Sequence, residues 1–348
     1  MELFLFTTKT IFSCLVIFLF SVVVTWATRI YTLKKSILDI PNERSSHHIP
    51  TPRGGGIAIV FIFIFTLLAL WSLGFIESSL FLTLAGGGLL VAFIGYYDDV
   101  YSIKAGWRIL FHFIAANWAF YWLGGFPVLD LGVSKIALHG VGYLFAIIGI
   151  VGCINFYNFM DGIDGLAGSE GIFIGLGSGI ALWIVGEYHT AIVLWFLASA
   201  IAGFTIWNWP PAKIFLGDVG SGFLGFIFAV LGLYTINKGF LPITFWWLLL
   251  AVFLCDTTFT LIYRIYQGKS WYSAHREHAY QHLIAYGANH KQVTLSIIII
   301  NYFILLPIAF AALYWPAQSL WFAGSSIIGL GLVWIFIKSR SIYLIRKN

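Results

Sequence analysis

The sequence predicts an all-α integral membrane protein that forms one polytopic domain over residues 1–348. Hydrophobic residue types make up 60% of the chain, and charged types make up 9%. A soluble domain carries about 25% charged residues, so most of this chain must face lipid or other helices. Apolar runs of about 20 residues, the length that a helix needs to cross a bilayer, recur along the chain. No large soluble domain is expected beside them.

About eleven membrane-spanning helices are predicted. They cover residues 4–27, 55–74, 79–96, 109–123, 141–158, 169–186, 190–208, 221–236, 241–263, 292–313 and 319–337. Residues 124–140 are expected to form a re-entrant or short strand-like connection. The cysteines lie in apolar stretches, so they are interpreted as small buried hydrophobic residues and not as a disulfide framework. These are Cys14, Cys153 and Cys255.

Basic residues are distributed unevenly between the two sides of the predicted bundle. If the connection after the first span is cytoplasmic, only Lys9, Lys135 and Lys238 of the 19 Lys and Arg residues fall on the other side. The positive-inside rule favours this arrangement, with a periplasmic N-terminus and a cytoplasmic C-terminus. The net charge of +5 is therefore interpreted as a result of the membrane topology, or as a source of attraction for anionic substrates and lipid head groups. No run of Lys and Arg is long enough to indicate nucleic acid as a partner.

Polar residues gather in the connections that this topology places in the cytoplasm, near residues 31–54, 97–108, 158–168, 209–221 and 264–291. The acidic residues there are Asp39, Glu43, Asp98, Asp99, Asp161, Asp164, Asp218 and Glu277, and seven of the nine histidines accompany them. Such a one-sided concentration exceeds what ordinary loops need. It predicts chemistry at the cytoplasmic face.

Two of these connections suggest anion and metal binding. Arg53 precedes Gly54, Gly55 and Gly56 at a predicted helix start, where free N–H groups attract phosphate. A turn-rich loop is the alternative.

The adjacent carboxylates of Asp98 and Asp99 are costly beside a membrane unless they have a partner, and Mg²⁺ is the natural one. A solvated helix end is the alternative.

The third connection combines amides and carboxylates. Asn155, Asn158 and Asp161 recur every three residues and would share one face if the helix continued. Asp164 follows after a glycine. Two carboxylates with two amides suit either a metal ion or a ribose and base.

The fourth connection adds another acidic residue. Asp218 is a third candidate metal ligand, and the preceding Lys213 and Phe215 offer a cation for phosphate and a ring for stacking on a base.

The fifth connection is rich in histidine. His275, His278 and His282 would line one face at helical spacing. That face would either be cationic and bind a diphosphate, or bind a metal ion. An amphipathic helix at the lipid head groups is a further interpretation, and it is compatible with both.

One carboxylate is predicted inside a membrane span. Asp256 is a functional candidate for that reason, and the alternative is an ion pair with Arg264, two turns further along. The role of Glu170 is left open.

These motifs resemble the polyprenyl-phosphate N-acetylhexosamine-1-phosphate transferases, which are glycosyltransferase family 4. The matching motifs span about residues 39–285, and they occur in the same order as in the family. It rests on PNERSSHHIPTPRGGG, Asp98-Asp99, NFMDGIDGLAG, KIFLGDVGSGFLG and HREHAYQHL. The dispersed histidines are similar to those of the enzymes that initiate O-antigen or enterobacterial common antigen. Some of these are thought to use 6-deoxy sugars, and the sugar is left open.

The resemblance implies transfer of N-acetylhexosamine-1-phosphate from a UDP-sugar to undecaprenyl phosphate at the cytoplasmic face of the bacterial inner membrane, with release of UMP. It implies Mg²⁺, with Mn²⁺ as a substitute, held by Asp99 and Asp218 and then by Asp98, which would otherwise meet the attacking lipid phosphate. The expected catalytic residues are Asp98, Asp99, Asp161, Asp164 and Asp218, of which Asp161 and Asp164 would, with Asn158, hold metal-bound water, ribose or uracil. The expected substrate-binding residues are Asn155, Asn158, Arg53, Lys213, Phe215, His275, Arg276, His278 and His282. Homodimerisation is left open.

Two other functions fit the sequence less well. A cation-coupled transporter would use Asp98, Asp99, Asp164 and Asp256, but transporter sites lie near the membrane midplane and most of these residues lie at helix ends. A non-catalytic lipid-binding scaffold is the third interpretation.

Overall fold

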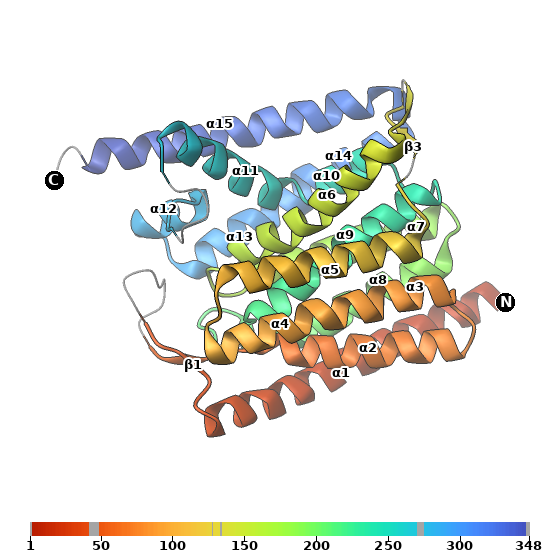
Figure 1. The fold of residues 1–348 in the computed structure, drawn as a ribbon, viewed down its shortest axis with the longest axis horizontal. Coiled ribbons are helices and arrows are strands. Elements are labelled where there is room, and N and C mark those ends of the chain that lie inside the picture. Colours follow the sequence, from red (N-terminus) through yellow and green to blue (C-terminus); the bar gives the residue numbers. More distant parts are fainter. Residues whose placement is uncertain (1, 42–48, 127, 133, 270–274, 346–348) are drawn as a thin grey trace.

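The computed structural model describes residues 2–41, 49–126, 128–132, 134–269 and 275–345 (Figure 1). His47 and His48, and the rest of the PNERSSHHIPTPRGGG motif from 42 to 48, lie outside the described residues. The described chain is nearly all helical, which confirms the all-α part of the predicted fold class. The helices are α1 (Glu2–Lys34), α2 (Gly56–Ser72), α3 (Ser78–Leu82), α4 (Gly88–Tyr101), α5 (Ala105–Leu123), α6 (His139–Phe159), α7 (Leu166–Ile184), α8 (Tyr188–Asn208), α9 (Asp218–Asn237), α10 (Ile243–Leu249), α11 (Ala251–Tyr266), α12 (Ala279–Ala285), α13 (His290–Ile300), α14 (Leu306–Tyr314) and α15 (Ser319–Ile345).

Eight helical stretches of the described chain are long and apolar enough to cross a membrane. A ninth is formed by α10 and α11 if this pair, bent by 79°, counts as one span. Each of the eleven predicted segments is helical, but α2 has only 17 residues and α5 is not among the eight. The structure therefore supports a multi-pass membrane protein, and the count of eleven stays a prediction. The π-helical segments η1 (Thr83–Gly87) and η2 (Asn301–Leu305) join α3 to α4 and α13 to α14.

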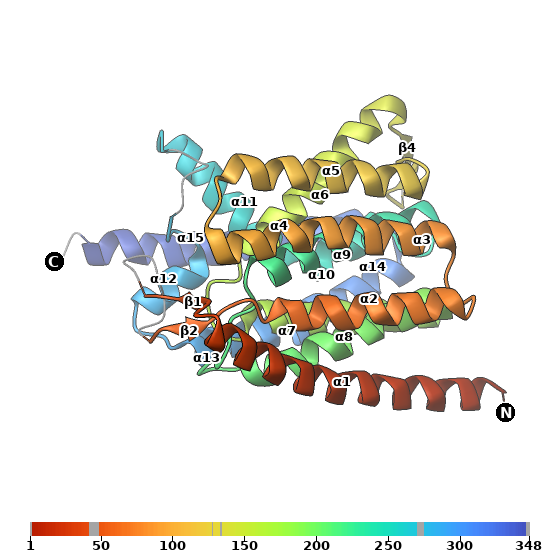
Figure 2. The ribbon, with the colours of Figure 1, turned by 60° about the horizontal axis from the view of Figure 1, so that its bottom comes forward.

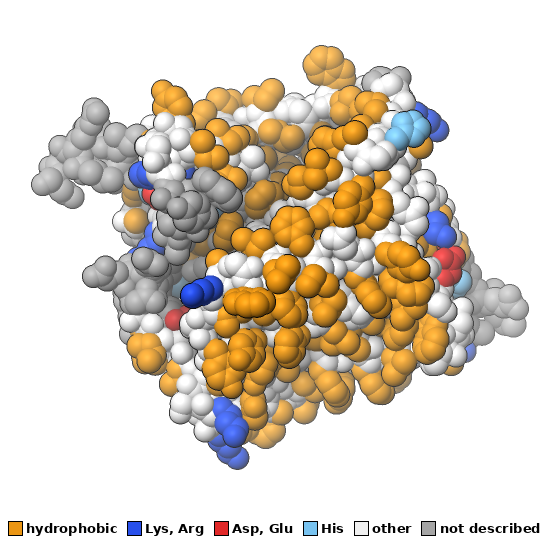
Figure 3. All heavy atoms as spheres, in the orientation of Figure 1, with side chains coloured by type: hydrophobic (Ala, Val, Ile, Leu, Met, Phe, Trp, Pro, Cys, Tyr) orange, Lys and Arg blue, Asp and Glu red, His pale blue; other side chains and the backbone are white. Residues whose placement is uncertain are grey.

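The helices run side by side along one direction (Figures 1 and 2). The start of α1 lies at the end of the bundle that carries β3 (Val128–Asp130), and α15 ends at the opposite end, which also carries α12 and β1 (Leu38–Asp39). Hydrophobic side chains cover the flank between these ends, while charged side chains gather toward the two ends (Figure 3). This distribution suits a bundle whose flank faces lipid.

Short strands form two of the connections. β3 pairs with β4 (Lys135–Ala137) in an antiparallel hairpin, so the predicted strand-like connection over 124–140 is confirmed. At the other end of the bundle, β1 pairs with β2 (Thr51–Pro52), also antiparallel. This second pairing brings the chain that follows β2 against the ends of α4 and α9.

Helix α9 lies at the centre of the site-bearing half and packs against α4 and α6. Glycines allow this close approach. A Cβ built on Gly95 of α4 would lie 2.5 Å from the Asp218 carbonyl oxygen, and one on Gly225 of α9 would lie 2.6 Å from the Cys153 carbonyl oxygen of α6. No side chain fits at such distances, so these backbones lie in direct contact. The end of α4, the end of α6 and the start of α9 are therefore held together.

Candidate active site

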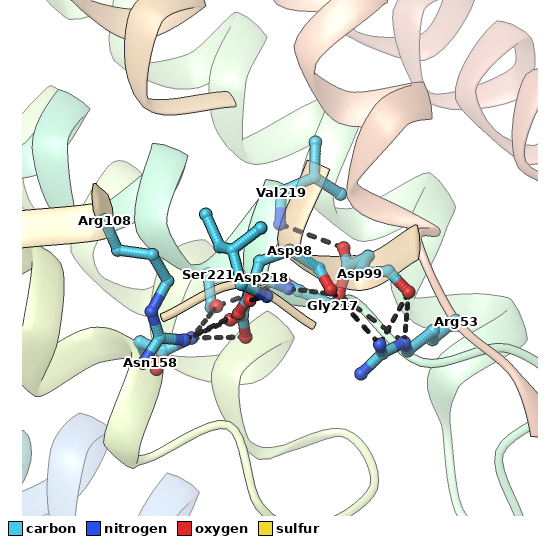
Figure 4. Close-up of polar contacts among 10 residues, drawn as sticks. Arg53, Asp98, Asp99, Arg108, Asn158, Gly217, Asp218, Val219 and Ser221 are labelled. Atoms are coloured by element: carbon cyan, nitrogen blue, oxygen red, sulfur yellow. Dashed lines mark hydrogen bonds and ion pairs between the residues drawn. The ribbon is translucent and has the colours of Figure 1, made fainter. Parts of the chain in front are cut away.

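The carboxylate of Asp99 joins α4 to α9. Its Oδ1 accepts a hydrogen bond from the Asp218 N–H at 3.0 Å, and its Oδ2 accepts one from the Val219 N–H at 3.1 Å (Figure 4). The residue is 4% exposed. A carboxylate at this place satisfies amides that have no partner within the helix and complements the positive end of the helix dipole. Asp99 thereby fixes Asp218 beside it, and the backbone engages both of its oxygens.

The guanidinium group of Arg53 closes the other end of this junction. Its Nε and Nη2 donate to the carbonyl oxygen of Asp99 at 2.9 and 2.5 Å, and Nη2 also donates to that of Asp98 at 3.4 Å. A cation at the C-terminal end of a helix is favourable for the same electrostatic reason. In this structure Arg53 holds the acidic pair in place, and its predicted contact with diphosphate or sugar stays a prediction.

Arg108 of α5 is a site residue that the sequence prediction missed. Its Nη1 lies 2.7 Å from Oδ2 of Asp98 and 2.7 Å from Oδ2 of Asp218, so one nitrogen bridges two carboxylates (Figure 4). Asp98 also accepts from the Ile103 N–H at 2.7 Å. One feature of the sequence could have identified Arg108: it is an arginine in the first turn of an apolar helix. Ionisable residues within such helices usually have a partner and a function.

The amide of Asn158 completes the contacts around Asp218. Its Nδ2 donates to Oδ1 of Asp218 at 2.8 Å and to Oγ of Ser221 at 2.9 Å. Asn155, one turn earlier, donates instead to the Val151 carbonyl of its own helix at 2.7 Å. Because α6 ends at Phe159, the helical face predicted for Asn155, Asn158 and Asp161 stops before Asp161.

Asp161 lies just beyond α6, close to the other acidic residues. Burial raises the pKa of its carboxyl well above the usual range, and the charges of Asp218, Asp99 and Asp164 raise this pKa further. The raised pKa reports an accumulation of negative charge at this end of the bundle. Such a place favours the arrival of a cation or a proton.

Asp164 lies at the wall of a neighbouring cavity of about 670 Å³. Its Oδ2 accepts from the Ala212 N–H at 3.0 Å, and its Oδ1 lies 3.2 Å from Nδ1 of His290. Phe215 lines the same cavity. The volume falls in the range of about 300–1,000 Å³ that is usual for small-molecule sites. The structure thus brings Phe215 and Asp164 to the same cavity, and their predicted contacts with a nucleoside stay predictions.

The three glycines after Arg53 serve packing. The N–H groups of Gly55 and Gly56 donate to the carbonyl oxygens of Phe215 and Leu216, both at 2.8 Å. A Cβ on Gly56 would lie 2.2 Å from Cα of Gly220. The predicted close backbone approach is therefore confirmed, but the expectation that both of these N–H groups are free to bind phosphate is wrong.

The histidine connection is only partly helical. α12 begins at Ala279, so His275, Arg276 and Glu277 precede it and the predicted helical face through His275, His278 and His282 is wrong. The rings of His275 and His278 nevertheless lie 4.9 Å apart, measured between centroids. Nε2 of His282 lies 2.9 Å from the ammonium of Lys338, which can only donate, so this nitrogen accepts.

Two predicted substrate-binding residues lie apart from the acidic contacts. Lys213 is exposed, and its ammonium lies over the ring of Trp207 at 5.4 Å from the centroid. Arg276 is exposed ahead of α12. Their predicted contacts with phosphate or sugar stay predictions.

A family model described as glycosyl transferase family 4 matches residues 81–236, which include Asp98, Asp99, Arg108, Asp161 and Asp218. Over these residues, the chain is similar to glycosyl transferase family 4. The matched region thus contains most of the acidic site, while the histidine connection lies beyond it.

Curated relatives resemble this chain over most of its length. The probable undecaprenyl-phosphate N-acetylglucosaminyl 1-phosphate transferase of Bacillus subtilis (strain 168) is 28% identical over 78% of this chain and 76% of its own. The decaprenyl-phosphate N-acetylglucosaminephosphotransferase of Mycobacterium leprae (strain TN) is 27% identical over 74% and 72%. The undecaprenyl-phosphate alpha-N-acetylglucosaminyl 1-phosphate transferase of Salmonella typhi is 28% identical over 81% and 78%.

The acidic site offers oxygen ligands, which Mg²⁺ prefers. Within the part of the chain that the structure describes, no three His, Cys, Asp or Glu side chains are arranged to hold a metal ion by themselves. Mg²⁺ usually takes one or two carboxylates, keeps waters and shares substrate phosphates, so it does not require three. Asp98 and Asp218 share the Arg108 nitrogen, whereas Asp99 is engaged by backbone amides. The donor set fits Mg²⁺ best at Asp98 and Asp218.

Acidification should destabilise the protein through its histidines. Burial lowers the pKa of His275 and of His282 to about 4, below the unperturbed value of about 6.5. Between these values the unfolded state binds more protons, so stability rises with pH and is lost as pH falls through this window. The thermal midpoint in detergent should therefore fall between pH 7 and pH 5. Replacing both histidines by Gln should make this fall smaller, and an equal fall in the double variant would contradict the assignment.

Proposed function

We propose that this protein transfers N-acetylhexosamine-1-phosphate from a UDP-sugar to undecaprenyl phosphate, forming undecaprenyl-diphosphate-sugar and UMP. The observation that carries the proposal is the convergence of Asp98, Asp218 and Arg108, at the same end of the bundle as the cavity lined by Asp164 and Phe215. The names of the relatives, which state N-acetylglucosaminyl 1-phosphate transfer to polyprenyl phosphates, support the same reaction.

The proposed reaction exchanges one phosphorus–oxygen bond for another. An oxygen of the lipid phosphate attacks the β-phosphorus of the UDP-sugar, a new bond forms there, and the bond to the UMP oxygen breaks. Such transfer depends on positioning and on neutralising charge more than on covalent chemistry by the protein. A phosphate monoester has its second pKa near 6, so the acceptor is largely dianionic at neutral pH and needs no strong base.

The residues of the chain would divide these tasks. Mg²⁺, held by Asp98 and Asp218 with Mn²⁺ as a substitute, would offset the repulsion between the two anionic substrates. Phe215 would stack on uracil, and Asp164 would shape the wall against which the nucleoside lies. Arg108 would turn from the carboxylates toward a phosphate. Asp161 and Asn158 would orient ribose or metal-bound water.

The distribution of Lys and Arg supports a site on the cytoplasmic side of the inner membrane. The start of α1 and the end of α15 lie at opposite ends of the bundle, which suits a periplasmic N-terminus and a cytoplasmic C-terminus (Figures 1 and 2). Only this interface would be reached both by a soluble nucleotide sugar and by the phosphate of a membrane lipid.

The reaction is tested with purified protein, undecaprenyl phosphate and UDP-N-acetylglucosamine labelled in its β-phosphate. Label should enter the lipid fraction, UMP should be released in equal amount, and both should require Mg²⁺. A panel with UDP-N-acetylgalactosamine and 6-deoxy analogues would identify the donor. If no donor labels the lipid, the proposal is wrong, and sugar that crosses sealed vesicles without lipid product would indicate transport instead.

Replacing Phe215 by Ala should weaken binding of the donor. Stacking of an aromatic ring on a base contributes about 1–3 kcal/mol, so KM for the UDP-sugar should rise roughly tenfold to a hundredfold with little change in kcat. Phe215→Tyr keeps the ring and should keep KM close to that of the unmodified protein. An unchanged KM in the Ala variant would remove Phe215 from the nucleoside site.

A further inference from the structure

The carboxylate of Asp256 on α11 holds the start of α12. Its Oδ1 accepts from the Ala279 N–H at 2.8 Å, and its Oδ2 accepts from the Tyr280 N–H at 3.3 Å. Thr260, one turn along α11, donates its hydroxyl to Oδ1 at 3.1 Å. Asp256 is 8% exposed, so these contacts are made away from bulk water. Arg264, the alternative partner expected from sequence, forms its ion pair with Glu277 at 2.7 Å.

The same carboxylate sets the position of the histidine pair. Nδ1 of His278 lies 3.5 Å from Oδ1 of Asp256, and His278 is buried. The ring of His278 lies 4.9 Å from that of His275 and 6.2 Å from that of Phe159, measured between centroids. Asp256 therefore anchors the connection through its backbone at residues 279 and 280 and through His278.

Tyr280 carries this anchorage to the loop after α6. Its phenol donates to the carbonyl oxygen of Phe159 at 3.0 Å. A Cβ built on Gly162 would lie 2.0 Å from the phenolic oxygen and 3.0 Å from the ring carbon that bears it. The loop that carries Asp161 thus lies directly on the tyrosine. Burial raises the pKa of this phenol far above its usual range, so it remains a donor at neutral pH.

We propose that Asp256 is a positioning residue: it fixes α12 so that Tyr280 supports the loop of Asp161 in the geometry that transfer requires. The chain of contacts runs from α11 through Tyr280 to Phe159 and Gly162, and it ends next to the acidic site. The catalytic part of this inference rests on the proposed function. The structural part, the coupling of three elements, does not.

A double-mutant cycle tests the contact between Tyr280 and Gly162. Gly162→Ala should lower kcat about 100-fold, because displacement of a catalytic group by about 1 Å has that effect. Tyr280→Phe removes the oxygen that the new methyl group meets. The double variant should therefore recover at least tenfold in kcat over Gly162→Ala. Losses that simply multiply would overturn the proposed contact.

Asp256→Asn tests the anchor without relying on catalysis. Asn keeps one accepting oxygen and loses the charge that faces the amides and His278. Amide hydrogen exchange should accelerate in residues 279–285 and in residues 160–165 together. Glu170→Gln, another buried acid whose partner is Asn301 at 2.6 Å, should leave both segments unchanged.

The two readouts separate the two proposals. If the unmodified protein shows no transfer to lipid, the proposed function is wrong and hydrogen exchange alone decides the anchorage. If transfer occurs but Asp256→Asn leaves exchange in both segments unchanged, Asp256 is not the anchor. A drop in kcat with unchanged KM for the donor in Asp256→Asn would agree with positioning of Asp161.

Discussion

Replacing Asp218 by Asn should lower turnover by about 10²–10³-fold, the range observed when one electrostatic contributor is removed from a preorganised site. The substitution preserves shape, and Asn158 can still donate to the remaining oxygen at this position. It removes the charge that Arg108 shares with Asp98 and that Mg²⁺ would use. The measurement is the initial rate of lipid labelling, with folding checked by the thermal midpoint.

The matched control is Glu77→Gln, which removes a carboxylate whose exposed ion pair with Lys238 spans 3.3 Å outside the acidic site. Its rate should equal that of the unmodified protein. Asp99→Asn should differ from both, because an amide group would then face the backbone N–H groups at the start of α9, and stability should fall together with activity. Near-normal turnover in folded Asp218→Asn protein would exclude a role in the reaction.

Gly95→Ala should damage both stability and activity. The new methyl group would meet the Asp218 carbonyl oxygen at 2.5 Å and Cα of Val219 at 2.7 Å, and backbone atoms cannot move aside as a flexible side chain would. Overpacking of this kind costs about 1–3 kcal/mol. It would also shift the start of α9, and a displacement near 1 Å is worth about 100-fold in rate.

Gly149→Ala provides the comparison, since a Cβ at this exposed position in α6 would meet no atom within 4 Å. Alanine has the higher helix propensity, by about 1 kcal/mol, so this variant should be at least as stable as the unmodified protein. The thermal midpoint and the labelling rate of both variants decide the question. Equal behaviour of the two would show that α4 and α9 do not touch at Gly95.

Residue types and their order were sufficient to predict the acidic and amide residues that gather around Asp218, but not Arg108. Asp98, Asp99, Asn158 and Asp218 come from three helices, and their common feature in the sequence is a place at the end of an apolar stretch. Helices of similar length in one bundle bring such ends together, so the shared side follows from topology. The contacts of Asp99 with two backbone amides, however, depend on the angle at which α4 meets α9. This angle depends on how the glycines of the two helices pack, and the amino-acid sequence does not show which glycines touch which helix.

The errors arose where a local pattern competed with distant contacts. The spacing of His275, His278 and His282 matched a helix, but Asp256 holds the backbone at residue 279 and the helix begins there. Free N–H groups were expected at Gly55 and Gly56, but the chain at Phe215 and Leu216 accepts their hydrogen bonds. Both partners lie more than 20 residues away in sequence, beyond the reach of periodicity or propensity.

Arg108 gives the acidic site a counterion of its own. With its guanidinium between Asp98 and Asp218, the two carboxylates can stay close without repelling one another, and the walls of the site keep their shape while no substrate is present. An incoming diphosphate would then find a cation already in place, mounted on a long and pivoting side chain. In the proposed function, recognition would be an exchange of partners: the arginine would leave a carboxylate for a phosphate, and the freed carboxylate oxygens would be available to hold Mg²⁺.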